Sequence, residues 1–116
     1  MKSYTDLEQS KKLAEILPLK SADMRFCFSH ILGGRIKGHY PMIGREPSMG
    51  TIPCWSLAAL LSVLPRIDIE KETWTDDTYD YRVKAYIDDG YVGDWFDNPI
   101  DACYNMIITL HEDKLL

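Results

Sequence analysis

The clearest pattern of apolar and polar positions in the chain lies between residues 97 and 112. Four apolar residues there recur at i, i+3, i+4 and i+7, which places them on one face of a helix: Cys103, Met106, Ile107 and Leu110. Asp97 or Asn98 can cap this helix, and Pro99 fits its first position. Asp101 adds negative charge at the positive end of the helix dipole. The pattern predicts a helix with one buried face.

A second helical pattern stands near the N-terminus. Thr5 and Glu8 have the spacing of a capping box, in which each side chain satisfies a backbone N–H group of the other residue. The apolar side of this helix consists of Leu7, Leu13, Ala14 and Leu17. Pro18 is expected to end it, because proline cannot continue a helix.

A third helix is predicted from Thr51 to Leu64, with Pro53 in its first turn and Pro65 as its stop. Its apolar residues surround nearly the whole circumference: Trp55, Leu57, Ala58, Leu60, Leu61, Val63 and Leu64. A helix that is apolar all round is buried, so this one should be the most deeply buried of the three.

Alternation with a period of two predicts strands before and after this helix. In the stretch 23–29, Met24, Phe26 and Phe28 share one face. Gly33-Gly34 is a plausible turn, a return strand starts at residues 35–37, and the remainder to Gly50 is predicted to be loop.

The second strand pair is predicted further along the chain. Ile67 and Ile69 suggest a short strand, and residues 70–78 an acidic connection. Residues 79–88 alternate most clearly, and Asp89-Gly90 is a strong two-residue hairpin signal. Residues 91–96 then return to the last helix.

The elements follow in the order α-β-β-α-β-β-α within a single domain, residues 1–116. Hairpins imply antiparallel pairs, so we expect an α+β fold. The expected architecture is a small, mainly antiparallel sheet of three to five strands packed with three helices, similar to an α/β/α sandwich.

Four segments carry a resemblance to known proteins: LEQSKKLAEILP (7–18), IPCWSLAALLSVLP (52–65), YRVKAYI (81–87) and NPIDACYNMIITLHE (98–112). Together they resemble a group of small uncharacterised proteins from gut anaerobes and their mobile elements. The layout is also similar to the alpha-beta-alpha sandwich domain of phage proteins. The resemblance implies a phage or mobile-element setting, and it brings no catalytic residues with it.

Composition narrows the function classes. The net charge of −5 disfavours a nucleic-acid binder, whose affinity depends on neutralising phosphates. No apolar run is long enough to cross a bilayer, and no signal peptide precedes the first helix. Three widely spaced cysteines argue for reduced thiols in the cytoplasm. Residues 67–101 hold eleven acidic residues against three basic ones, an asymmetry suited to a cationic partner or to self-association.

Cys54 is the candidate reactive group. In the first turn of the predicted helix, its thiolate would be stabilised by the helix dipole, and His30, His39 or His111 would have to supply a base. This arrangement would make an enzyme or a small-molecule binder. The alternative is a small buried core residue, which its apolar neighbours favour. Cys27, His30 and His39 match no standard zinc spacing, so no metal or other cofactor is expected.

The remaining candidates are binding residues. Trp74, Tyr91 and Trp95 would make a surface for a protein partner or a sugar ring if they were exposed together, and Tyr91 and Trp95 are expected to share one face of the last strand. Three basic residues of the 30–50 segment are candidates for weak anion contact: Arg35, Lys37 and Arg45. With no convergent polar triad in view, we favour an accessory protein that binds a protein partner or itself without catalysis.

Overall fold

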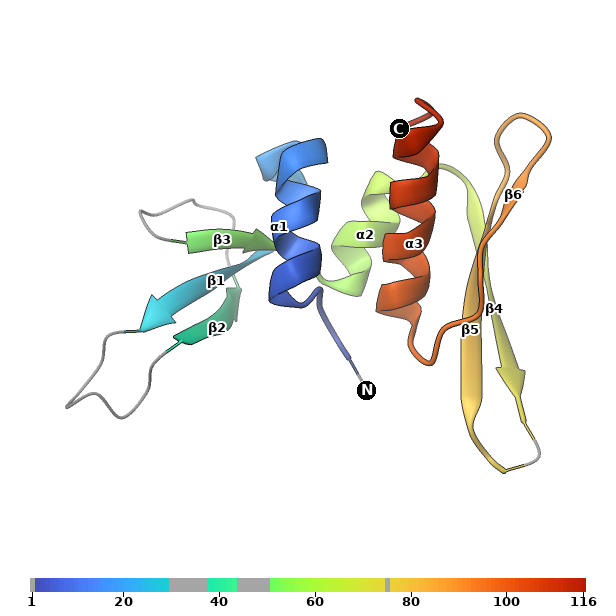
Figure 1. Cartoon of the computed structure of the whole chain (residues 1–116), viewed down its shortest axis with the longest axis horizontal. Coiled ribbons are helices and arrows are strands. Elements are labelled where there is room, and N and C mark those ends of the chain that lie inside the picture. The colour runs from blue at the N-terminus through green and yellow to red at the C-terminus, as the bar shows by residue number, and fades with distance from the viewer. Residues whose placement is uncertain (1, 30–37, 44–50, 75) are drawn as a thin grey trace.

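Three helices separate two antiparallel sheets in the computed structural model of the chain, which describes residues 2–29, 38–43, 51–74 and 76–116 (Figure 1). The side chains of residues 27–29 and 38–43 lie outside that description. The elements are α1 (Leu7–Ile16), a 3₁₀ helix (Leu19–Ser21), β1 (Met24–Ser29), β2 (Gly38–Ile43), β3 (Thr51–Cys54), α2 (Leu57–Val63), β4 (Ile67–Thr73), β5 (Tyr79–Ala85), β6 (Tyr91–Val92) and α3 (Pro99–Glu112).

The strand order is β2-β1-β3 in one sheet and β4-β5-β6 in the other, and every pair is antiparallel. The α+β class and the mainly antiparallel pairing are therefore as the sequence predicted. The arrangement of layers differs, because the strands form two sheets rather than one. Helix α1 packs on β3, α3 packs on β5, and α2 packs on α3. The helices therefore lie between the sheets, and the molecule is elongated, with extents of 52 × 38 × 19 Å (Figure 1).

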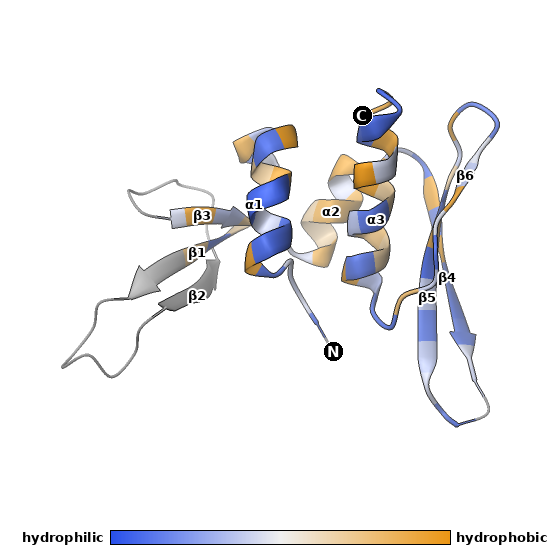
Figure 2. Cartoon of the chain, viewed as in Figure 1, coloured by the Kyte–Doolittle hydropathy of each residue, from blue (hydrophilic) through white to orange (hydrophobic). Residues whose placement is uncertain are grey.

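The core forms where these helices meet β5. Trp55, Leu60 and Ile107 have no exposed surface, and Val83 of β5 is equally buried against them. Figure 2 shows apolar residues concentrated on the helices, whereas β4 is largely hydrophilic. Among the described residues, no helix is long and apolar enough to span a membrane.

The predicted closing helix is confirmed as α3. Asn98 is its N-cap, since its side-chain oxygen accepts a hydrogen bond of 2.8 Å from the backbone N–H of Asp101. Pro99 occupies the first turn as expected. The four residues of the predicted apolar face are all buried: Cys103, Met106, Ile107 and Leu110. Local capping signals and the 3.6-residue period were sufficient to place this element.

Helix α1 begins one residue later than its sequence predicted. Its N-cap is Asp6, which forms a capping box with Gln9, rather than Thr5 with Glu8. The hydroxyl of Thr5 accepts instead from the backbone N–H of Trp55 at 3.1 Å and bonds to Ser10 at 2.7 Å. A buried tertiary role therefore replaces the capping role of Thr5.

The helix predicted from Thr51 to Leu64 is wrong in its first part. Residues Thr51–Cys54 form β3 and pair with β1, and α2 starts only after the N-cap Ser56. Pro53 is tolerated in a strand because β3 lies at the edge of its sheet, where a missing N–H costs little. Cys54 therefore ends a strand and does not lie in the first turn of a helix.

Two strands extend into segments predicted to be loop. Residues 38–43 form β2, and β4 runs through residues 70–73, where an acidic connection was expected. Cross-strand ion pairs of Glu70 explain why acidic residues fit in β4. A turn does form at Asp89-Gly90, where Gly90 has a φ of +90° and donates to the carbonyl of Ile87 at 2.8 Å. The two-residue hairpin is wrong, because β5 ends at Ala85 and the loop to β6 spans residues 86–90. The Gly33-Gly34 turn lies outside the described residues.

Candidate functional site

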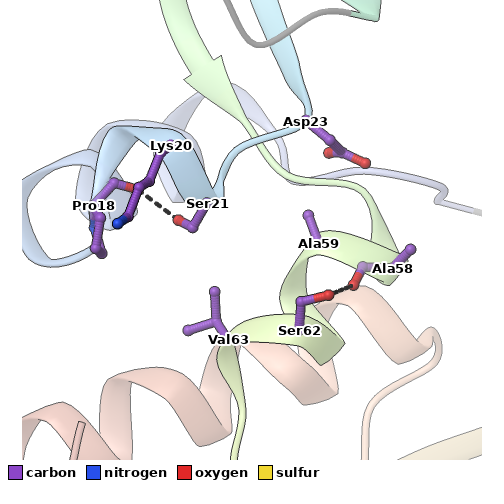
Figure 3. A pocket seen from close by; sticks show the side chains of 8 residues that line it. All are labelled: Pro18, Lys20, Ser21, Asp23, Ala58, Ala59, Ser62 and Val63. Atoms are coloured by element: carbon purple, nitrogen blue, oxygen red, sulfur yellow. Dashed lines mark hydrogen bonds between the residues drawn. The ribbon is translucent and has the colours of Figure 1, made fainter.

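A pocket of about 400 Å³ opens between the 3₁₀ helix and α2 (Figure 3). Three of its polar side chains, those of Ser21, Asp23 and Ser62, are hydrogen-bonded within the protein. The Ser21 hydroxyl donates to the carbonyl of Pro18 at 2.6 Å and accepts from the indole N–H of Trp55 at 2.9 Å. The carboxylate of Asp23 accepts from the backbone N–H and the hydroxyl of Ser56. These contacts stabilise the entry to α2 and leave no assembled reaction centre in this pocket.

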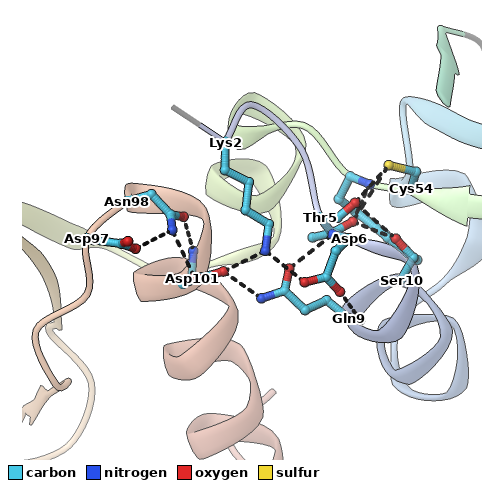
Figure 4. A network of polar contacts seen from close by, with 10 residues as sticks. Lys2, Thr5, Asp6, Gln9, Ser10, Cys54, Asp97, Asn98 and Asp101 are labelled. Carbon is cyan, nitrogen blue, oxygen red and sulfur yellow. Dashed lines mark hydrogen bonds and ion pairs between the residues drawn. The ribbon is translucent and has the colours of Figure 1, made fainter. Parts of the chain in front are cut away.

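A polar network joins the N-terminal segment to α1 and α3 (Figure 4). Lys2 Nζ lies 2.8 Å from Asp101 and 2.9 Å from Asp6, and Gln9 Nε2 donates to Asp101 at 2.7 Å. Partial burial opposes ionisation of Asp101, but hydrogen bonds from Lys2, Asn98 and Gln9 outweigh it and hold its pKa below the usual value. Lys2, Asp6 and Asp101 each have a bonding partner within the network, so its role is structural, and we call it the Lys2–Asp101 clasp.

Cys54 lies next to this clasp with no exposed surface. Its thiol is 3.4 Å from the carbonyl oxygen of Thr5 and 3.7 Å from the Thr5 hydroxyl (Figure 4). Burial raises the pKa of the thiol, against smaller opposing effects of Thr5 and Ser10. An activated thiolate needs exposure and a lowered pKa, so the geometry favours a core role for Cys54.

We therefore expect Cys54 to resist alkylation in the folded protein. In a Cys27→Ser background, iodoacetamide at about pH 8 should modify Cys54 roughly 100-fold more slowly than it modifies the urea-unfolded chain, since modification requires an opening of the structure. Cys103, whose burial raises its pKa to about 12, is the internal control. Rapid modification of Cys54 alone below about pH 8 would contradict this expectation and revive the thiolate hypothesis.

Two of the three histidines proposed as partners of Cys54, His39 and His111, are not brought to it by the described backbone. His39 pairs with Phe28 on β1, whereas Cys54 pairs with Met24, four residues or about 13 Å along that strand. His111 lies in the exposed last turn of α3. Within the described residues, no group of three His, Cys, Asp or Glu side chains is placed to hold a metal ion. His30 and the side chain of Cys27 lie outside them.

Two of the predicted binding residues, Trp74 and Trp95, meet on the outer face of the sheet β4-β5-β6, the face turned away from α3. Alternation along β5 directs Val83 and Ala85 inward to α3, so Asp80, Arg82 and Lys84 point outward. Cross-strand partners extend this face onto β4 and β6: Asp68, Glu70, Glu72 and Val92. No described helix covers it.

Trp74 and Trp95 both join this outer face. The indole N–H of Trp74 donates to Asp80 at 2.8 Å, and the side chain is 45% exposed. The guanidinium of Arg82 stacks on Trp95, 4.6 Å from the ring centroid. Asp80 and Arg82, the residues that these tryptophans contact, are two positions apart on β5. The two points of contact therefore lie about 7 Å apart along the strand.

Tyr91 is separated from these tryptophans. It pairs with Ala85 and therefore shares the inner face, where it packs against the core beside α3. Its hydroxyl donates to the carboxylate of Asp113, which raises the pKa of Tyr91. The expectation that Tyr91 and Trp95 share one face is wrong, because β6 ends at Val92 and the alternation does not continue to Trp95.

The charged residues of the outer face form two groups: an ion-paired group in the middle of the sheet and an acidic group at the β4–β5 turn. In the middle, Glu70 binds Arg82 at 2.6 Å and Lys84 at 2.7 Å, and these two cations hold its pKa below the usual value. At the β4–β5 turn the described residues include four carboxylates without an ion pair: Glu72, Asp76, Asp77 and Asp80. The turn end of the sheet is therefore strongly acidic, with an exposed tryptophan at its centre.

The sequence analysis named Trp74 and Trp95 as candidates but did not name the charged residues that contact them, Asp80 and Arg82. A usable signal was present, because the acids of 68–72 and the bases of 82–84 alternate with matching periods and can pair across a hairpin. The anion-contact candidates Arg35, Lys37 and Arg45 lie outside the described residues.

Comparisons of the chain with protein-family models, with curated proteins and with solved structures found no match.

Proposed function

We propose that this protein acts by binding another protein, without a catalytic step, through the outer face of the sheet β4-β5-β6. The observation that carries the proposal is that two tryptophans, the exposed Trp74 and the arginine-stacked Trp95, lie on one sheet face that no described helix covers. Tryptophan and arginine are the residue types that most often dominate the energy of protein interfaces.

Two further observations support a binding role. Tyr86 and Val92 are 53% and 61% exposed on the same face, and they extend its apolar area beyond the tryptophans. In the part of the chain that the structure describes, the side chains of the Lys2–Asp101 clasp bond to one another and form no nucleophile–base pair. We place this activity in the cytoplasm, in a phage or mobile-element setting, on the sequence patterns alone; the neighbouring genes test that setting.

The experiment is affinity capture with the wild-type chain and with Trp74→Ala and Trp95→Ala, from cells of its own source. We expect each tryptophan variant to lose roughly 30-fold or more in affinity for the captured protein while keeping the wild-type unfolding midpoint. Leu19→Ala, which removes an equally exposed apolar side chain from the 3₁₀ helix, is the matched control and should bind normally.

Self-association is tested on the same samples by size-exclusion chromatography with light scattering at low and high salt. A strictly monomeric chain that captures no protein, or one whose capture is unaffected by both tryptophan substitutions, would contradict the proposal. A dimer that dissociates in both tryptophan variants would instead make a second copy the partner.

A further inference from the structure

The free edge of β4 continues the outer face and is built to accept another strand. Strand β4 is the terminal strand of the order β4-β5-β6, so one side of its backbone pairs with no described residue. In Figure 1 the sheet β4-β5-β6 lies at the margin of the molecule, on the other side of α3 from α1. Strand β4 is seven residues long, and an edge strand of that length is a template for pairing with another chain.

The hydrogen-bond pattern identifies which groups are unpaired. Trp74 donates to the carbonyl of Thr78, and Tyr86 donates to the carbonyl of Arg66, so 74/78 and 66/86 are hydrogen-bonded pairs. Pairs of this kind alternate along an antiparallel ladder, so the even-numbered residues of β4 bond to β5. The N–H and C=O groups of the odd-numbered residues therefore point outward: Ile67, Ile69, Lys71 and Thr73.

Lys71 is the residue of β4 that could discourage pairing at this edge, but its side chain is directed toward β5. Lysine side chains on edge strands discourage pairing, and β4 has one, Lys71. Its ammonium lies 4.1 Å from the ring centroid of Tyr79 and 5.9 Å from that of Tyr81, both on β5. The side chain thus lies back over the sheet. Ile69, beside it on the same face, is 38% exposed.

The charges of β4 specify the occupant. An added strand would place alternate side chains beside Asp68, Glu70 and Glu72 on the outer face. Glu70 is neutralised by Arg82 and Lys84, whereas Glu72 forms no ion pair in the described part of the chain and belongs to the acidic turn end. The other side chains of the added strand would cover the exposed Ile69. An alternation of basic and apolar residues fits both requirements.

A second copy of β4 fits poorly. Antiparallel self-pairing centred on Ile69 sets Glu70 opposite Asp68, and centring on Glu70 sets Asp68 opposite Glu72. Centring on Lys71 sets Glu70 opposite Glu72. Like charges directly opposite each other destabilise a strand pair, so every central register is unfavourable.

We infer that β4 docks an extended segment of the partner protein, with basic and apolar residues in alternation, as an added strand of the sheet. This inference rests on the proposed function and names the chemistry and the mode of the interaction. Backbone hydrogen bonds to the odd-numbered residues of β4 supply affinity, while basic side chains at Glu72 and the acidic turn supply specificity.

The probe is a capped eight-residue peptide that alternates lysine and valine, titrated against the full chain by fluorescence anisotropy. We expect binding that weakens with salt, and at least roughly tenfold weaker binding of two control peptides. One control alternates glutamate and valine. The other keeps the lysines and carries proline in place of the two central valines, so it cannot pair as a strand.

Variants of β4 distinguish peptide binding at the backbone edge of the strand from binding to the side chains of the outer face. Ile69→Pro removes an outward N–H without breaking the β4–β5 ladder, and we expect it to weaken peptide binding at least roughly tenfold, whereas Ile69→Val binds normally. Glu72→Lys should weaken the binding of the lysine–valine peptide and strengthen the binding of the glutamate–valine peptide. Circular dichroism of each variant should match the wild type. If the proline variant does not fold, amide hydrogen exchange at the wild-type edge tests strand addition without it.

Amide hydrogen exchange distinguishes failure of this inference from failure of the proposed function. On peptide binding, the amides of Ile69 and Lys71 should become protected, because they are the outward donors. Binding that depends on Trp74 and Trp95 without protecting these amides would overturn strand addition and leave face binding intact. Absence of peptide binding, alongside tryptophan-dependent capture of a partner, would overturn the basic-segment chemistry alone. A dimer that depends on β4 would show that a second copy of the chain, and not a basic segment of a partner, occupies the edge, and would overturn the inference.

Discussion

Replacing Trp55 with alanine lowers the free energy of unfolding by about 3–5 kcal/mol, the largest effect we expect from a single substitution. Trp55 has no exposed surface, and its indole N–H donates to Ser21 at 2.9 Å. Truncation leaves a cavity where α2 meets the rest of the core, and it removes the hydrogen bond to the 3₁₀ helix. Urea unfolding followed by circular dichroism measures the loss.

Two substitutions calibrate that result. Trp55→Phe keeps most of the ring volume but loses the hydrogen bond, so it should cost about 1–2 kcal/mol. Trp74→Ala removes an exposed tryptophan and should change stability by no more than about 0.5 kcal/mol. A loss below about 1 kcal/mol for Trp55→Ala would show that this side chain is not a centre of the core.

Replacing Asp101 with alanine costs about 2 kcal/mol at neutral pH, the second largest effect. The carboxylate accepts hydrogen bonds from Lys2, Gln9 and Asn98, and these bonds tie the N-terminal segment and α1 to α3. Removing the carboxylate leaves three donors without this acceptor. Asp94→Ala, at an exposed carboxylate near β6, is the matched control and should be close to neutral.

The contribution of Asp101 also depends on pH with a definite sign. Because the pKa of Asp101 is lowered from 3.8 in the folded protein, its stabilising contribution is present above that value and is lost as the pH falls through the lowered pKa. The pKa of Lys2 is raised from 10.5, since the hydrogen bonds to Asp101 and Asp6 outweigh its desolvation, so its contribution persists up to that pH and is lost above it. Unfolding at about pH 3, 5 and 7 should show the difference between wild type and Asp101→Ala shrinking only at the lowest pH. A difference that is unchanged at about pH 3 would contradict an ionic clasp.

The sequence predicted an element correctly where interactions within that segment decide its conformation, and incorrectly where pairing with a distant segment decides it. Helix α3 was placed correctly because its cap, its proline and its apolar face lie within one segment. The segment 51–54 has the same kind of local signals, with a proline before an apolar run, yet it forms β3. Pairing with β1, more than twenty residues away, decided its conformation.

The candidate site was predictable only in part for the same reason. Trp74 and Trp95 stood out as aromatic residues in an acidic segment, but their common face depends on contacts with Asp80 and Arg82. Tyr91 was assigned to the wrong face because strand alternation was assumed to continue beyond Val92. The Lys2–Asp101 clasp joins residues 99 positions apart, and no local pattern indicates such a pair.

Periodicity and capping within short segments were enough to predict the α+β class, the three helices, the antiparallel pairing and the burial of the apolar face of α3. Three features became visible in the folded chain alone: the strands form two sheets on either side of the helices, Cys54 is enclosed beneath Thr5, and β4 presents a free edge beside an acidic turn. These features depend on which distant segments pair, and pairing is governed by packing and charge across the whole chain rather than by neighbouring residues.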